Sequence, residues 1–296
     1  MNSPLPTKPV YKRQRFLLSF IKSMGKPSTV IDLQKLLFLY SENQKNDFYD
    51  FIPYLYGCYS FQAAEDVNTL ERNGWIMKTE NFIQYRFPDF KNQSELNFSD
   101  NYVPPKERGN SLIKLVYEQY PYFAINSKIA REIMDEPGLS RIEGVKKSLK
   151  KNTQVLFTIG YEGISIEKYL NTLIQNDIRL LCDVRSNPLS RKFGFSKSNL
   201  QHYLKNINIE YIHIPELGII SEKRQNLETD ADYVQLFKNY EKSLTSRQQY
   251  LEKVYQLLSS KKRIALTCFE HDPLHCHRHI ISKQIADTYN VTTGDL

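Results

Sequence analysis

The sequence has no apolar run that approaches the roughly 20 residues of a membrane-spanning helix. Its start, MNSPLPTKPVYKRQRF, also lacks the apolar stretch and small-residue cleavage site of a secretory signal. Four cysteines in 296 residues are too few for a disulfide framework. These absences predict a cytoplasmic protein with no membrane partner, whose cysteines are thiols that serve in catalysis, metal binding or packing.

Several common catalytic signatures are absent as well. The sequence contains no GxxxxGK[ST] phosphate loop, no GxGxxG after a strand, no HExxH and no GxSxG. These absences argue against a P-loop ATPase, a dinucleotide-dependent dehydrogenase, a zinc protease and a serine hydrolase.

The composition is that of a globular chain long enough for two domains. Hydrophobic residues make up 41% and charged residues 25% of the chain. The formal net charge of +7 favours an acidic partner such as nucleic acid, although an excess of this size is also common in proteins that bind none.

The N-terminal half, residues 1–150, has the pattern of helices followed by a β-hairpin. RFLLSFIKSM and STVIDLQKLLFLYSENQ place apolar residues at helical spacing. A third amphipathic helix is expected from Phe61 to Asn73, and two short strands around Trp75 to Phe87. Two helices, a further helix and a small β-wing predict a mainly helical, winged-helix-like domain.

Residues Leu33 to Ile76 also resemble the Panacea family, the domain found in SocA-like antitoxins. The resemblance rests on LQKLLFLYSENQ and on YLYGCYSFQAAEDVNTLERNGWI, where Cys58 stands at a position usually held by proline. It implies a module that contacts DNA or a partner protein.

The remainder of this half is less regular. The segment from Pro88 to Pro105 is expected to be a loop, and helices are expected at Ser111–Tyr120 and Ser127–Asp135. The basic run VKKSLKKN, which ends at Asn152, is either a solvated helix end or a stripe that faces phosphate.

The C-terminal half, residues 151–296, alternates buried strands with amphipathic helices. A strand, a helix and a strand joined by few residues form a βαβ crossover, which requires a parallel pair of strands. We therefore predict an α/β domain with a mostly parallel sheet flanked by helices. The four predicted strands lie in QVLFTIGYEG, IRLLCDVRSNP, IEYIHIPELG and KRIALTCFE.

Three of these strands end in unusually polar segments. They are GYEG at 160–163, DVRSNPLSRKFGFS at 183–196 and CFEHDPLHCHR at 268–278. Because ligands of open parallel sheets bind beyond the carboxyl ends of the strands, we expect the three segments to meet in one pocket.

Arginines and small polar residues in these segments suit an anionic ligand. Arg185 and Arg191 could bind phosphate or carboxylate bidentately, with Ser190 adding a neutral hydrogen bond. Alternatively, Arg185 pairs with Asp183 or Glu162 and fixes the loops. The residues predicted to bind the ligand are Tyr161, Glu162, Arg185, Ser186, Asn187, Arg191 and Arg278.

The last segment offers a nucleophile and proton-transfer groups. Cys276 stands where the closing helix begins, so the helix dipole and neighbouring basic residues would lower the pKa of its thiol. Glu270 would act as general acid or base. The predicted catalytic residues are Asp183, Glu270, Cys276 and His277.

Two other interpretations of the cysteines remain open. Cys268, His271, Cys276 and His279 have Cys-x-x-His spacings that could hold zinc. Alternatively, the cysteines are small buried residues that support the loop. The prediction adopted is that the protein has no metal and no other cofactor.

TIGYEG, DVRSNPLSRKFGFS and CFEHDPLHCHR together resemble the family called domain of unknown function 488. Its ending, C-x-E-x-x-P-x-x-CHR, corresponds to Cys268, Glu270, Pro273 and residues 276–278. The resemblance implies an α/β fold with a shared polar site and names no reaction. The strand ending in DVR also resembles rhodanese-like domains but lacks their cysteine loop, which leaves sulfur transfer as a minor option.

Taken together, these features predict a nucleic-acid-associated protein. Its C-terminal domain would recognise or process a nucleotide or modified base, and its N-terminal domain would contact DNA or a protein partner. The alternative is a non-catalytic, antitoxin-like or defence-associated regulator that binds a protein partner or a ligand.

Overall fold

The computed structural model describes residues 6–45, 47–87, 102–220 and 229–296, with only the backbone of Asp230. The chain divides into two compact units, Met1–Ser148 and Leu149–Leu296. Most of the loop predicted from Pro88 to Pro105 falls on residues outside the described ones. No helix among the described residues is both long and apolar enough to span a bilayer.

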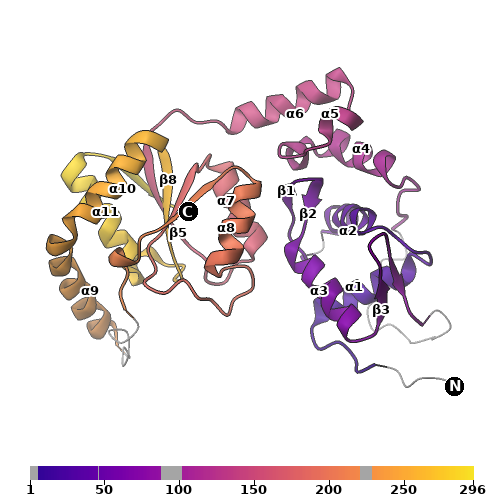
Figure 1. Cartoon of the computed structure of the whole chain (residues 1–296), viewed down its shortest axis with the longest axis horizontal. Helices are drawn as coiled ribbons and strands as arrows, with labels where there is room; N and C mark the ends of the chain where they lie inside the picture. Colours follow the sequence, from indigo (N-terminus) through magenta and orange to yellow (C-terminus); the bar gives the residue numbers. More distant parts are fainter. Residues whose placement is uncertain (1–5, 46, 88–101, 221–228) are drawn as a thin grey trace. The chain divides into compact units, whose positions relative to one another are not determined.

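The N-terminal unit is mainly helical and contains two short hairpins (Figure 1). Its strands are β1 (Ile52–Tyr54), β2 (Gly57–Tyr59), β3 (Ile76–Lys78) and β4 (Ile83–Tyr85). Its helices are α1 (Lys12–Ser23), α2 (Val30–Gln44), α3 (Phe61–Arg72), α4 (Asn110–Gln119), η1 (Pro121–Ala124) and α5 (Ala130–Ile133), followed by α6 (Glu136–Leu149).

Local capping explains where two of these helices begin. The Thr29 side chain accepts a hydrogen bond from the backbone N–H of Asp32 at 3.0 Å, and the Ser60 side chain accepts one from Ala63 at 3.2 Å. A backbone bridge joins Ser28, which lies between α1 and α2, to Ile83 in β4. The segment before α2 thus adds a third chain to the β3–β4 hairpin.

The C-terminal unit is an α/β structure. Its strands are β5 (Val155–Gly160), β6 (Leu180–Asp183), β7 (Glu210–His213), β8 (Arg263–Cys268) and β9 (Thr292–Asp295). Its helices are α7 (Ile166–Gln175), α8 (Lys197–Asn206), η2 (Pro215–Leu217), α9 (Asp230–Leu244), η4 (Thr245–Arg247), α10 (Gln248–Lys261), η5 (Pro273–His275) and α11 (His277–Tyr289).

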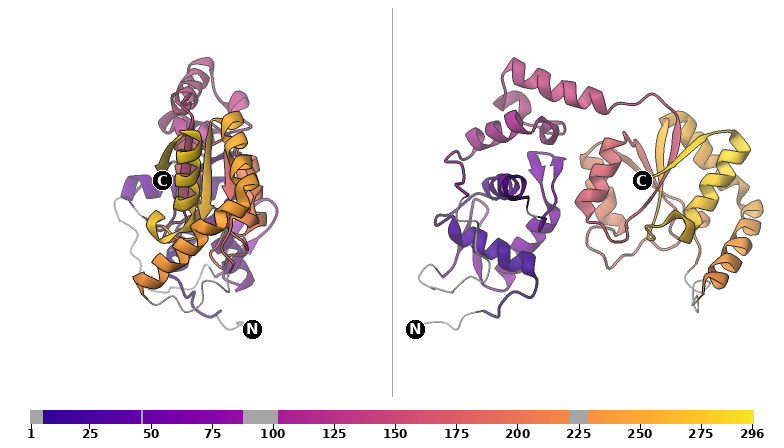
Figure 2. Two further views of the ribbon diagram at one scale, coloured as in Figure 1. Left: turned by 90° about the vertical axis from the view of Figure 1, so that its left-hand side faces the viewer. Right: turned by 180° about the vertical axis from the view of Figure 1, so that it is seen from behind.

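The five strands of this unit form one parallel sheet in the order β7-β6-β8-β5-β9. Helices α7 and α8 lie on one face of the sheet, and α10 and α11 lie on the other (Figures 1 and 2). The second face holds an apolar cluster that includes Leu156, Ile264 and Leu266 of the sheet and Leu251 and Ile281 of the helices. The predicted α/β unit with a parallel sheet is therefore confirmed.

The β1–β2 hairpin was not predicted, and two further elements differ from the predictions. The chain forms an additional edge strand, β9, from TTGD, a segment without apolar alternation. It pairs with β5, and the Thr158 hydroxyl lies 2.6 Å from a carboxylate oxygen of Asp295. The run VKKSLKKN belongs mostly to α6, a helix that begins at Glu136, before the predicted basic run. Most residues of this helix are exposed.

Candidate functional site

The carboxyl ends of three neighbouring strands carry the three polar segments. Gly160 of β5 is level with Cys268 of β8, and Asp183 of β6 is level with Thr267 of β8. The backbone N–H groups of Tyr161 and Glu162 both donate to the carbonyl of Phe269, at 3.1 and 2.9 Å. The sheet order therefore brings segments that are about 100 residues apart in the sequence to one edge.

Two glycines allow the loops to approach the strands closely. A Cβ atom at Gly160 would lie 1.8 Å from the carbonyl oxygen of Glu270. A Cβ atom at Gly218 would lie 2.3 Å from the backbone nitrogen of Ser186. Both distances are far below van der Waals contact, so the positions of these loops depend on glycine.

Asp183 and Arg185 form a buried, bidentate ion pair at the end of β6. The Arg185 guanidinium donates from Nε to Asp183 Oδ1 at 2.8 Å and from Nη2 to Oδ2 at 2.5 Å. Tyr211 on β7 also donates to Oδ2, at 2.6 Å. Burial alone would lower the pKa of Arg185, but the hydrogen bonds and charge of Asp183 outweigh it and raise that pKa.

The remaining donor of Arg185, Nη1, is also engaged. It donates to the Tyr161 hydroxyl at 2.8 Å and to the Phe195 carbonyl at 2.9 Å. Burial, followed by the charge of Asp183, raises the pKa of Tyr211. Two roles were predicted for Arg185, anion binding and pairing with a carboxylate. The structure shows the second, in which the guanidinium pairs with Asp183 and fixes the loops.

A pocket of about 380 Å³ opens over this pair. Its lining comes from the segments that follow β5, β6 and η2, from the end of β8 and from the start of α11. The residues are Tyr161, Arg185, Ser186, Asn187, Leu189, Ser190, Arg191, Lys192, Ile219, Cys268, Phe269 and His277. Arg191 is exposed, and within the described part of the chain its side chain has no hydrogen bond or ion pair. It is thus the cation in the pocket that is most available to an anionic ligand.

Phe269 and Lys192 line the pocket but are not among the residues predicted from the sequence. Phe269 exposes 43% of its surface. Its ring meets the Tyr161 ring edge to face, with 5.4 Å between the ring centroids. Lys192 donates from Nζ to the Tyr161 carbonyl, and burial lowers the pKa of its ammonium group. The run RKFGF, in which two basic residues precede two aromatic residues, was the signal that could have drawn attention to Lys192.

Cys268, Cys276 and His277 gather at the inner wall of the pocket, which Cys268 and His277 line. Nδ1 of His277 lies 3.8 Å from Sγ of Cys268 and 3.7 Å from Sγ of Cys276. The cysteines are 3% and 0% exposed, and burial, followed by the neighbouring Cys268, raises the pKa of Cys276 well above its ordinary value. The predicted lowering of that pKa is wrong, because the cost of burying a thiolate outweighs the stabilisation that the helix dipole was expected to provide.

The zinc ligand set considered from the sequence does not assemble. His271 is exposed, and Nδ1 of His279 is 2.6 Å from the backbone carbonyl of Cys276. In the described residues, the ligand-bearing groups that come together are instead Cys268, Cys276 and His277. Spacing could not predict this set, because His277 is adjacent to Cys276 in the sequence.

Arg278 organises the loop between β8 and α11. It is 1% exposed, donates from Nε to the Thr158 hydroxyl at 3.1 Å and donates from Nη1 and Nη2 to the carbonyls of Glu270 and His271. The Glu162 carboxylate accepts a hydrogen bond from the backbone N–H of His271 at 3.2 Å. Both side chains thus hold the same loop in place.

The predicted site residues separate into two groups. Those that line the pocket are Tyr161, Arg185, Ser186, Asn187, Arg191 and His277. Those that lie behind or beside it are Glu162, Asp183, Glu270, Cys276 and Arg278. The first group faces the pocket, whereas the second supports its walls.

The fold and the pocket together define an α/β unit with a polar pocket at the carboxyl edge of a parallel sheet. Residues 165–285 match the model of the family described as "Domain of unknown function DUF488". The match confirms the C-terminal resemblance over these residues, which include the DVRSNP and CFEHDPLHCHR segments. No curated protein and no solved structure matches the chain.

Proposed function

We propose that the C-terminal unit recognises or processes a nucleotide or a modified base, free or within a nucleic acid. One observation carries the proposal: a single pocket is lined both by the exposed ring of Phe269 and by the unengaged guanidinium of Arg191. A base can stack on an aromatic ring, which contributes about 1–3 kcal/mol, and a guanidinium can bind the phosphate bidentately.

The remaining lining residues fit such a ligand. Ser190 and Asn187 each accept a backbone hydrogen bond within their own loop, from Lys192 at 3.2 Å and from Leu189 at 3.2 Å. Their side-chain donors are available to phosphate or ribose oxygens. Lys192 adds a second positive charge beside Arg191.

We also propose that the N-terminal unit is winged-helix-like and Panacea-like, and that it contacts a partner protein. The bridge from Ser28 to Ile83 gives the β3–β4 hairpin the third chain expected of a wing. Helix α3 would occupy the position that reads DNA in helix-turn-helix proteins. Its single basic residue, Arg72, is paired with Glu65 at 2.8 Å, which disfavours duplex DNA on this helix.

The first test is a titration of the full chain with a labelled single-stranded oligonucleotide and with a nucleoside monophosphate across a salt series. Arg191→Gln is expected to weaken binding about tenfold or more, because a charge-assisted hydrogen bond contributes about 1.5–3 kcal/mol. The salt slope for the oligonucleotide is expected to fall by about one. Lys253→Gln removes the same charge from exposed α10, away from the pocket, and serves as the matched control.

The ring of Phe269 is tested separately. Phe269→Leu keeps apolar bulk but loses the aromatic face, so it is expected to weaken binding nearly as much as Phe269→Ala. Equal effects of Arg191→Gln and Lys253→Gln, or no binding by the wild type at low salt, would contradict the proposal.

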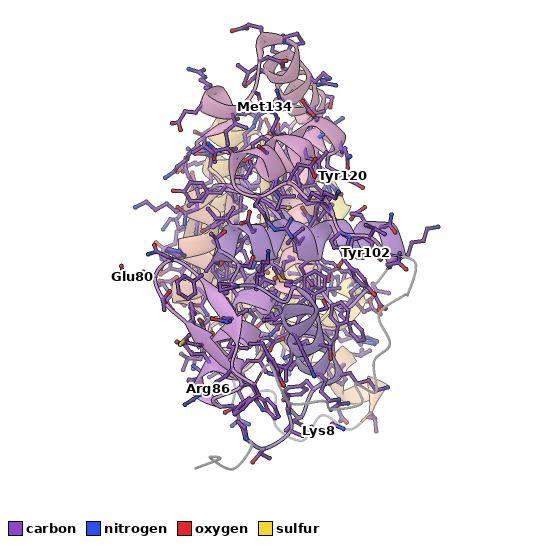
Figure 3. The ribbon with its side chains drawn as sticks, turned by 90° about the vertical axis from the view of Figure 1, so that its right-hand side faces the viewer. Lys8, Glu80, Arg86, Tyr102, Tyr120 and Met134 are labelled. Atoms are coloured by element: carbon purple, nitrogen blue, oxygen red, sulfur yellow. The ribbon has the colours of Figure 1, made fainter. Side chains whose placement is uncertain are left out.

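A further variant separates the two units. Arg86 is exposed just after β4 in the hairpin (Figure 3). If Arg86→Gln weakens oligonucleotide binding while Arg191→Gln does not, the N-terminal unit holds the nucleic acid. The non-catalytic regulator would then become the better description.

A further inference from the structure

The cluster of Cys268, Cys276 and His277 has the geometry of a metal site. Cys268 ends β8, Cys276 caps α11 and His277 is the first residue of that helix. One ligand atom from each residue lies within 4.8 Å of the others. The three side chains are between 0% and 3% exposed, so they converge on a shared point inside the protein.

The separations match those of tetrahedral zinc. Zn–S bonds of about 2.3 Å and Zn–N bonds of about 2.0–2.1 Å place a sulfur and a nitrogen ligand about 3.5–3.6 Å apart. The observed Nδ1–Sγ separations are 3.7 and 3.8 Å. Each of these two separations exceeds the expected range by only a few tenths of an ångström.

The other ring nitrogen of His277 fixes the form of the ring. Nε2 lies 3.1 Å from the backbone carbonyl of Val184, which can only accept, so Nε2 carries the proton. The lone pair of a neutral ring is then on Nδ1, the atom that faces both sulfurs. Histidine ligands of metals are ordinarily held in this way by a carbonyl or carboxylate.

The charge of the set also suits a buried divalent cation. Binding would displace one proton from each thiol, so that two thiolates balance the charge of Zn²⁺ and the neutral imidazole adds none. The centre as a whole would be uncharged, which limits the cost of burying it.

We propose that Cys268, Cys276 and His277 bind one Zn²⁺ ion, with a fourth coordination position directed to the pocket. Cys268 and His277 both line that pocket, so a water molecule or a ligand atom could reach the metal. Three protein ligands with an open fourth position are typical of catalytic zinc, which lowers the pKa of bound water. The proposal does not depend on nucleotide binding.

The test uses the full chain, purified without chelators. Elemental analysis is expected to find about one zinc per chain, and the chelator-treated protein is expected to recover it from Zn²⁺ in competition with a chromophoric chelator. Replacement by Co²⁺ is expected to produce thiolate-to-metal charge-transfer absorption. This spectrum tests the ligands in the wild type, without any substitution.

Variants then identify the ligands. Cys276→Ser and His277→Gln are expected to lower zinc affinity by more than about 100-fold, the upper limit for loss of an outer-shell partner alone. Cys182→Ser removes another buried thiol of the same sheet and is expected to bind normally. His277→Cys replaces one ligand by another and is expected to restore binding that His277→Gln loses, which a packing role would not do.

Two outcomes would overturn the proposal. The first is the absence of zinc from the wild type even with excess Zn²⁺. The second is a Co²⁺ spectrum without thiolate bands, or equal zinc affinity in Cys276→Ser and the wild type.

Discussion

At the scale of single residues, much of the charge near the pocket stabilises the protein itself. Asp183 is 0% exposed and Arg185 is 6% exposed, and each satisfies the other's hydrogen bonds. Arg278 likewise donates hydrogen bonds to Thr158 and to two loop carbonyls. Arg191, one residue before Lys192 in the same loop, is left to face solvent. Residue type alone could not separate these roles, because all three arginines follow strand ends or begin a helix.

Asp183→Asn is expected to destabilise the C-terminal unit by about 3–5 kcal/mol, because it leaves a buried guanidinium without its counter-charge. The free energy of unfolding in urea measures the effect. Glu210→Gln breaks the exposed pair with Lys261 and is expected to cost less than about 1 kcal/mol. Equal stability of the two variants would contradict a structural role for the Asp183–Arg185 pair.

Lys192 predicts a pH dependence for anion binding. Burial lowers the pKa of its ammonium group below 10.5, so in the free protein the positive charge is lost at a lower pH than for an ordinary lysine. Affinity for a nucleoside monophosphate is therefore expected to fall as pH rises toward 10.5. Lys192→Arg stays charged over this range and is expected to show a flatter profile between pH 7 and about 10. Parallel profiles would exclude Lys192 as a contributor.

At the scale of elements, the sequence predicted those segments whose apolar pattern is strong. Helix α2, helix α3 and the strands β5, β6 and β8 all appear where periodicity placed them. The edge strand β9 and the β1–β2 hairpin were not predicted. Their strands are only three or four residues long, which is too short for a clear hydrophobic pattern, and their pairing partners are set by the folded chain.

The candidate site was predictable to a similar degree. The three polar segments were recognised because strand ends rarely collect arginine, glutamate and histidine together. Burial was not predictable, and it reversed the expected pKa shift of Cys276 and enclosed Arg278. These properties depend on how α11 packs against the sheet, which the residues of CFEHDPLHCHR do not encode by themselves.

The close approach at Gly160 leads to a prediction about the β8–α11 loop. Gly160→Ala is expected to displace the Glu270 carbonyl and to destabilise the protein by about 1–3 kcal/mol, with loss of ligand binding. Gly144→Ala is the matched control, because Gly144 lies in exposed α6 with nothing near its missing Cβ. That substitution is expected to stabilise the protein by about 0.4–1 kcal/mol. Thermal unfolding of both variants measures the contrast, and effects of the same sign would contradict it.

At the scale of the whole molecule, the two units have separate architectures and separate cores. The proposed pocket and the proposed zinc ligands all belong to Leu149–Leu296. The N-terminal unit buries its own apolar residues, among them Leu17, Leu37 and Phe38 of α1 and α2. The proposed ligand binding and the proposed partner recognition are thus assigned to different units.

The position of β8 in the sheet has a consequence for synthesis of the chain. Strands β5 and β6 are joined only through β8, which is made about 80 residues after β6. A nascent chain that has not reached Cys268 lacks β8, so β5 and β6 cannot take their native places in the sheet. The edges that they present to β8 stay unpaired until β8 has been synthesised. The C-terminal unit is thus expected to fold late and slowly, and to be vulnerable to aggregation or proteolysis if translation pauses before β8.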